Sequence, residues 1–153
     1  MKFTFKKSER LNSKKVIERL FDKKGSEEIR SVFHYPFRVS YAPIFDFRFS
    51  ISDLEENEQL NPHSEIATAA VKNLIPELPQ ILISVSKRSF KRAVDRNLVK
   101  RRIREAYRLN KHILLQKPTH QIPAYIAFVY IAKTMEDYAK IEKSMKAIFQ
   151  KMV

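Results

Sequence analysis

The residues in this sequence whose types and spacing indicate a chemical role lie in one strongly basic segment, from Lys87 to Lys111. It contains eleven lysines and arginines against two acidic residues, Asp95 and Glu105, for a local net charge of +9. Such a density of positive charge predicts binding of a polyanion through its phosphate groups, with release of the counterions that those phosphates hold.

Projected onto a helix, residues 96–114 of this segment separate into two arcs. An apolar arc, expected to pack on a sheet, consists of Val99, Ile103, Ala106, Tyr107, Ile113 and Leu114. The second arc, which holds no acidic residue, consists of Asn97, Lys100, Arg101, Arg104, Arg108 and Lys111. Like charges one turn apart repel by roughly a few tenths of a kcal/mol per pair, so an external partner such as RNA phosphate is expected to offset the repulsion. The alternative is a solvated basic face. Asn97 is suited to read a sugar or base edge, or else bonds locally in the first helical turn.

Catalysis by the protein itself would need a different set of residues. The carboxylates of Asp53, Glu55, Glu56 and Glu58 form a cluster, and paired carboxylates can hold magnesium for phosphodiester hydrolysis. They lie in a polar stretch with little apolar sequence to fix their geometry, so a solvated acidic loop is the preferred interpretation. The histidines (His34, His63, His112 and His120) share no metal-ligand spacing. We therefore expect no catalytic residue and no metal site in the protein.

Composition narrows the class of protein further. The chain has 153 residues, 30 Lys+Arg against 17 Asp+Glu, and a formal net charge of +13. Without cysteine there is no disulfide framework or thiolate zinc site, and a single glycine, Gly25, excludes a glycine-rich phosphate loop. No apolar run is long enough to span a bilayer, and the first residues do not resemble a signal peptide. We expect a cytoplasmic protein with a nucleic-acid partner, no membrane partner and no small-molecule substrate; a membrane-surface protein is the weaker alternative.

Hydrophobic periodicity predicts the elements that must position the basic segment. Helices are expected at about residues 13–23, 93–115 and 136–152, the first with Ser13 as N-cap and with Gly25 just after its end. Strands are expected at 37–41, at 80–86 in a central position, and at 123–131, buried on both faces. Residues 44–51 are interpreted as a further strand or an extension of the first, and residues 53–78 as an acidic loop with a possible short helix at 66–74. This order favours an α+β or α/β sandwich with helices over one sheet.

The segment from residue 85 to residue 107 closely resembles the signature of the bacterial ribonuclease P protein subunit. Val85-Ser-Lys-Arg88 ends a strand, and Arg96-Asn97 opens the basic helix that runs on through Tyr107. The likeness extends to Arg10-Leu11, the first helix with Phe21, the strand near 35–41, and the C-terminal strand and helix. The third motif position is Leu98 where the family has arginine, and no glycine stands between Arg88 and Arg92 where members often have one.

The resemblance implies a fold and a function. The fold would be α+β, one domain over residues 1–153, an αβββαβα-type sandwich with a four-stranded mixed sheet, similar to domain 2 of ribosomal protein S5. The basic helix would lie in a left-handed βαβ crossover, and an acidic insertion would occupy about residues 50–78. The protein would be the accessory subunit of an endoribonuclease whose catalytic RNA removes the 5′ leader of precursor tRNA. It would bind no cofactor by itself, and magnesium would come with the RNA.

The resemblance also assigns residues to two binding sites. The catalytic RNA would be contacted by Lys87, Arg88, Lys91, Arg92, Arg96, Asn97, Lys100, Arg101, Arg104 and Arg108. The tRNA 5′ leader would lie in a cleft between the first helix and the sheet, lined by Ile17, Phe21, Phe37, Val39 and Tyr41, where aromatic rings can stack on unpaired bases. Core packing explains Phe21, Phe37 and Tyr41 equally well. An RNA-binding module of ribosomal or RNA-chaperone type remains the alternative function.

Overall fold

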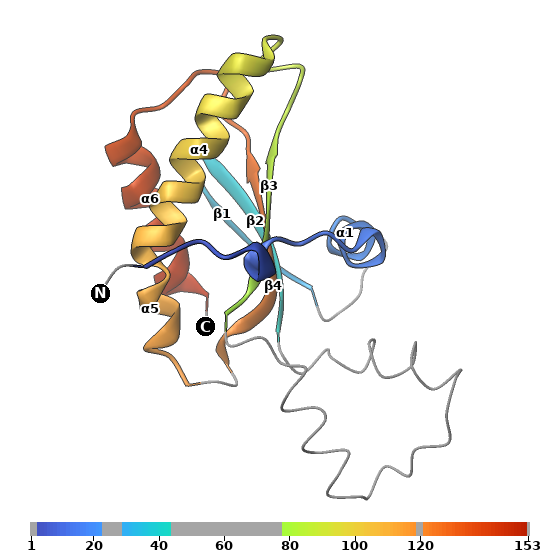
Figure 1. Cartoon of the computed structure of the whole chain (residues 1–153), viewed down its shortest axis with the longest axis vertical. Coiled ribbons are helices and arrows are strands. Elements are labelled where there is room, and N and C mark those ends of the chain that lie inside the picture. The colour runs from blue at the N-terminus through green and yellow to red at the C-terminus, as the bar shows by residue number, and fades with distance from the viewer. Residues whose placement is uncertain (1–2, 23–28, 44–77, 119–120, 153) are drawn as a thin grey trace, which may run out of the picture.

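The computed structural model describes residues 3–22, 29–43, 78–118 and 121–152 (Figure 1). These residues form the short 3-10 helix η1 (Lys7–Glu9), α1 (Lys14–Leu20), β1 (Arg30–His34), β2 (Phe37–Pro43), β3 (Gln80–Val85), α4 (Ala93–Asn110), α5 (His112–Leu115), β4 (Pro123–Tyr130) and α6 (Tyr138–Lys151). Together they make an α+β structure.

The described strands form a four-stranded mixed sheet in the order β1-β2-β4-β3. β1 and β2 form an antiparallel hairpin, β2 is antiparallel to β4, and β3 is parallel to β4. Two parallel neighbours need a crossover connection, and α4 with α5 provides it. The N-terminal arm, residues 3–13, reaches the outer edge of β3, where the backbone N–H of Leu11 donates to the carbonyl of Ile81 at 3.0 Å.

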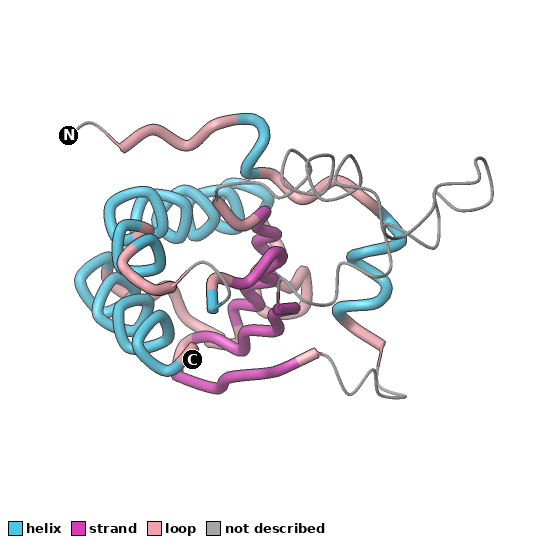
Figure 2. The backbone as a smooth tube through the Cα atoms, turned by 90° about the horizontal axis from the view of Figure 1, so that it is seen from below, coloured by secondary structure: helices cyan, strands magenta, loops and turns pink. Residues whose placement is uncertain are grey.

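The helices cover the two faces of this sheet unequally. α4, α5 and α6 lie together on one side, whereas α1 lies on the other (Figures 1 and 2). Alternation along each strand produces these two faces. The main core forms under α4 and α6 and contains Phe37 and Val39 from β2, Phe128 from β4, and Ile103 and Tyr107 from α4, all completely buried. A smaller cluster under α1 contains Leu11, Leu20 and Ala127, with Ile17, Ala42, Leu82 and Tyr125 packed against it.

The helices predicted from periodicity are confirmed, with small changes in extent. The segment at 93–115 is α4 followed by the single turn α5, and the segment at 136–152 is α6. The first helix ends at Leu20, earlier than predicted. Ser13 takes the N-cap position with an extended backbone but its side chain makes no capping hydrogen bond.

The strands at 37–41 and 123–131 are also confirmed, as β2 and β4. The predicted position of the third strand is not confirmed, and the predictions for residues 44–77 cannot be compared with the described structure. The central position expected for the segment at 80–86 is wrong, because β3 is the last strand of the sheet. Its apolar pattern arises because Ile81 and Leu82 are packed on opposite faces and the N-terminal arm covers its edge. The strand at 44–51, the acidic loop up to residue 77 and the helix at 66–74 lie outside the described residues.

One strand was missed by the sequence patterns. β1 pairs with β2 along Arg30–His34, yet only Val32 among its residues packs against the main core. Ser31 and Phe33, the neighbours of Val32 in the chain, are both exposed. A short edge strand with one core residue lacks the alternating apolar pattern that identifies a half-buried strand.

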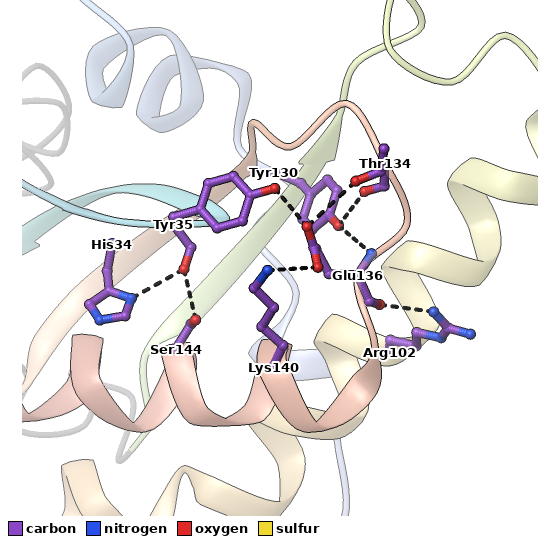
Figure 3. A network of polar contacts seen from close by, with 8 residues as sticks. All are labelled: His34, Tyr35, Arg102, Tyr130, Thr134, Glu136, Lys140 and Ser144. Atoms are coloured by element: carbon purple, nitrogen blue, oxygen red, sulfur yellow. Dashed lines mark hydrogen bonds and ion pairs between the residues drawn. The ribbon is translucent and has the colours of Figure 1, made fainter.

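A polar network ties the β1–β2 turn to the start of α6 (Figure 3). The Tyr35 hydroxyl donates to the Glu136 carboxylate at 2.6 Å, and the Lys140 ammonium lies 2.9 Å from the same carboxylate. The Ser144 hydroxyl donates to the Tyr35 carbonyl at 2.8 Å, while Arg102 of α4 donates to the Glu136 carbonyl at 2.9 Å. The network therefore joins the hairpin, α4 and α6 at one corner of the molecule.

This network predicts an acid-dependent loss of stability. Hydrogen bonds from the Tyr35 hydroxyl and the Lys140 ammonium hold the pKa of Glu136 below its ordinary value of 4.5. A carboxyl whose pKa is lowered by folding stabilises the fold at pH values above its ordinary pKa. This contribution disappears as the pH falls through the lowered pKa. The free energy of unfolding of Glu136→Gln, measured with urea, should therefore fall less between pH 7 and pH 3 than that of the wild type. The matched control is Glu18→Gln, an exposed carboxyl on α1; an equal acid dependence in wild type and Glu136→Gln would contradict the prediction.

Candidate nucleic-acid interface

The turn between β3 and α4 presents the first group of predicted cations. Phe90 is buried at the centre of the turn, 6.0 Å from the Tyr130 ring, and its backbone N–H donates to the Ser86 carbonyl at 3.1 Å. With Phe90 turned inward, the flanking basic side chains are exposed; they are Lys87, Arg88, Lys91 and Arg92. An apolar anchor therefore fixes a turn whose charged side chains stand in solvent, without the glycine that the resemblance would place there.

Arg96 lies near the start of α4, and its side chain reaches back to the connection between β3 and α4. Its guanidinium donates to the carbonyls of Phe90 and Lys91, at 2.8 Å each. Both bonds use the same nitrogen, Nη1, so other donors of the guanidinium remain for a partner. Arg96 thus holds the basic turn against the helix start, a positioning role that the sequence did not indicate.

The exposed surface of α4 next to this turn carries the second group. Asn97 and Arg101 are exposed and Lys100 is half-buried. Within the described ranges these three side chains make no hydrogen bond or ion pair, so their polar groups are available to a ligand. Leu98, which replaces the family's third motif residue, is 38% exposed on the same helix. An apolar side chain therefore stands where the resemblance would place a cation.

The C-terminal half of α4 differs from the prediction, because its cations contact the protein itself. Arg108 donates two bonds to Glu105, at 2.6 and 2.9 Å, and a third to the Phe3 carbonyl of the N-terminal arm. The bond from Arg108 lowers the pKa of Glu105. Arg104 lies 5.9 Å from the centre of the Phe5 ring. The basic arc itself holds no acidic residue, as predicted, but Glu105 lies beside it on the helix and partly neutralises it at this end.

Lys111, also predicted to lie in the basic arc, is instead buried. Its ammonium forms an ion pair of 2.8 Å with Glu9, and the two side chains are 4% and 2% exposed. The same ammonium donates to the Thr4 carbonyl at 2.6 Å, and Glu9 also accepts the backbone N–H of Lys6 at 2.6 Å. The pair fastens the N-terminal arm to the end of α4. Helical projection missed it because the partner lies about a hundred positions earlier in the chain.

The predicted leader cleft is wrong in the placement of its sheet residues. Phe37, Val39 and Tyr41 are buried in the main core under α4 and α6, on the face of the sheet away from α1. They cannot face Ile17 and Phe21, because alternating residues of a strand point to opposite faces. For Phe37 and Tyr41 the core-packing interpretation is the correct one. Ile17 packs under α1, and Phe21, which follows α1, is 43% exposed.

Metal sites and membrane spans were searched in the described ranges. They contain no group of three or more histidine, aspartate or glutamate side chains placed to hold a metal ion. The carboxylate cluster at 53–58 lies outside these ranges, as do His63 and His120. His34 and His112 each contact a nearby backbone carbonyl through Nδ1. None of the described helices has the length and apolar character to cross a membrane.

Comparison with known proteins bears on what this basic surface binds. The ribonuclease P protein component of Porphyromonas gingivalis is 49% identical over 69 residues, which are 43% of this chain and 49% of that protein. That of Idiomarina loihiensis is 38% identical over 99 residues, 60% of this chain and 72% of that protein. That of Chlorobaculum tepidum is 44% identical over 66 residues, 38% and 42% of the two chains. The match to the first of these relatives thus spans about half of its length, and no solved structure matches. A family model described as Ribonuclease P, however, matches residues 5–153, and the chain therefore belongs to the Ribonuclease P family.

Proposed function

We propose that this protein is the RNA-binding protein subunit of a ribonuclease P ribonucleoprotein that removes the 5′ leader of precursor tRNA. Hydrolysis of the phosphodiester is assigned to the catalytic RNA with its magnesium ions, and the protein supplies binding and orientation. The observation that carries the proposal is a group of cations in the turn 86–92 and the first half of α4 that have no partner among the described residues, in a member of this family; they are Lys87, Lys91, Arg92, Lys100 and Arg101.

The catalytic RNA is proposed to dock on this group of cations. The turn 86–92 and the first half of α4, which carry these cations, lie at one end of the molecule (Figure 1). Each phosphate that they neutralise releases condensed counterions, which makes the binding strongly salt-dependent. Asn97 lies among them and can donate and accept hydrogen bonds at a sugar or base edge. Arg96 has the additional task of holding the turn in place, since two backbone carbonyls already accept from it.

The 5′ leader is proposed to lie on the opposite side of the sheet from α6, along the face that carries α1. The leader is therefore no longer assigned to the face that contains Phe37, Val39 and Tyr41, because these residues are buried in the main core. The exposed ring of Phe21 offers a stacking surface for an unpaired base, and Ile17 contributes to the apolar support below it. The N-terminal arm fixes α1 with respect to α4, because it is bound to Lys111 at one end and to Ile81 at the other.

Three finer points belong to the same proposal. The βαβ crossover from β3 through α4 to β4 is taken to be left-handed, as in the S5 domain 2-like fold that the family resemblance implies. The chain is taken to form one domain with an acidic insertion at about residues 50–78. The cytoplasm, where precursor tRNA is processed, is the proposed location.

Cleavage of precursor tRNA at low magnesium concentration tests the proposed function. The assay uses catalytic RNA from the same organism, with and without this protein. We expect cleavage when both are present and little with either alone, because protein cations reduce the magnesium needed to neutralise the RNA. Cleavage by the protein alone would overturn the assignment of chemistry to the RNA. Tight RNA binding without stimulation of cleavage would instead favour an RNA-binding module of ribosomal or chaperone type.

A further inference from the structure

An aromatic side chain stands exposed on the β1–β2 hairpin. Phe33 is 65% exposed, the highest value for any phenylalanine in the described part of the chain. It lies within a paired strand, so its exposure does not come from a loose loop. Burying a phenylalanine is worth about 1.5–3 kcal/mol, so a partner that covered this ring would gain free energy by removing it from water.

The residue opposite Phe33 is a cation. Phe33 is paired with Arg38 across the hairpin, and residues directly opposite in an antiparallel pair have Cβ atoms about 4.5–5.5 Å apart on the same face. Arg38 is exposed and, in the described ranges, makes no hydrogen bond or ion pair. The next residues across the sheet are Val129 and then Ser84, so no acidic side chain lies in this row.

The pair is on the face of the sheet that carries α1, but α1 does not cover it. The neighbours of both residues, Val32 and Val39, pack in the main core, which places Phe33 and Arg38 on the other face. α1 packs on β2 at Ala42, four residues beyond Arg38 and so about 13 Å along the strand. The end of this face, which no helix of the described ranges covers, therefore continues past α1 to the outer strand β1.

We propose that Phe33 and Arg38 form a second binding site for an unpaired nucleotide of the leader, with the base stacked on the Phe33 ring and a phosphate held by Arg38. This inference rests on the proposed function and extends the leader path from α1 to the hairpin. Single-stranded RNA fits the pair better than a protein partner does, because an aromatic ring beside an unpaired guanidinium on an open sheet matches the stacking and phosphate contacts of such RNA. The net charge of +13 has the sign that this ligand requires.

The test compares precursor tRNAs with a short and a long 5′ leader, bound to the holoenzyme assembled with catalytic RNA. With Phe33→Ala, we expect the dissociation constant for the long-leader substrate to rise roughly 5- to 30-fold, within the range known for stacking on one base. The short-leader substrate, which does not reach the hairpin, should bind unchanged. Phe33→Trp should keep full affinity, whereas Phe33→Leu, which is apolar but lacks an aromatic face, should behave like Phe33→Ala. Arg38→Gln should weaken binding of the long leader and reduce its salt dependence.

Leu115→Ala, which removes another exposed apolar side chain on α5, is the matched control and should bind both substrates normally. The two proposals fail in different ways. If the wild-type holoenzyme binds the long-leader precursor no better than tRNA without a leader, the proposed leader function is wrong. Equal binding of short and long leaders would overturn the hairpin site alone. If the wild type prefers the long leader and Phe33→Ala keeps that preference, the hairpin site alone is overturned. A loss that is equal for both leaders would also overturn it, since the effect would then not depend on the leader.

Discussion

Replacing Lys111 with methionine is expected to lower the free energy of unfolding by about 3–5 kcal/mol, the usual cost of removing one partner from a buried ion pair. The variant leaves the Glu9 carboxylate buried at 2% exposure with its only cationic partner in the described structure removed. It also removes the donor to the Thr4 carbonyl. Urea unfolding followed by circular dichroism measures the effect. Lys146→Met is the control, since its ion pair joins an exposed lysine to the half-buried Glu142 near the surface and should contribute about 1 kcal/mol at most.

The double variant Glu9→Gln/Lys111→Met separates the ion pair from the packing around it. If the main cost is an unpaired buried charge, the double variant should be more stable than Lys111→Met alone, because the charge has been removed. An additive result, in which the double variant loses the sum of what Glu9→Gln and Lys111→Met each lose alone, would show that the two side chains act independently. Hydrogen exchange should locate the loss in the N-terminal arm and the end of α4, the two segments that the pair joins.

Replacing Lys100, Arg101 and Arg104 with glutamine is expected to flatten the salt dependence of RNA binding by about 0.7–0.9 units of log–log slope for each phosphate that is no longer neutralised. If each of the three cations neutralises one phosphate, the slope therefore falls by about 2 to 3 units in total. Lys100 and Arg101 make no ion pair within the described structure, so their charges are available to RNA. Titration of the catalytic RNA at several salt concentrations measures the slope. An unchanged slope would mean that RNA docks elsewhere on the protein.

Arg108→Gln is the control for this experiment, because it removes the same kind of charge from the same helix. Its guanidinium is already paired with Glu105 and with the Phe3 carbonyl. We therefore expect Arg108→Gln to change the slope by less than the average of the three other replacements. An equal change would show that RNA displaces Glu105 and that the whole length of α4 is in contact.

The family and most of the helices and strands were predicted from local sequence. The apolar spacing of Val99, Ile103 and Tyr107 follows the helical repeat, and these residues are completely buried in α4. The continuous apolar run at 123–131 indicates a strand covered on both faces, and β4 is such a strand. The concentration of cations in the turn 86–92 and in α4 was also predicted, since local charge density does not depend on what the rest of the chain does.

What the sequence could not determine was which face of the sheet each element covers. Alternation in β2 shows that Phe37 and Val39 share a face, but α1 and the α4–α6 pair were both candidates to cover it. In the tertiary structure α4 and α6 cover this face, so Phe33 and Arg38 lie on the opposite face, which carries α1. The order of the strands, with β3 at the edge, was likewise decided by pairing between distant segments.

The same limit applies to individual charges. Lys100 and Lys111 fall in one arc of a helical projection, yet the first keeps its charge free within the described ranges and the second is buried against Glu9. Periodicity reports the direction of a side chain relative to its own helix. The free energy of a charge depends instead on the groups that surround it in space, and here those groups come from an arm about a hundred residues away. Residue type, spacing and net charge thus determined that this protein is basic, and the motif at 85–107 indicated its family, whereas only tertiary contacts decided which of the described cations remain unpaired.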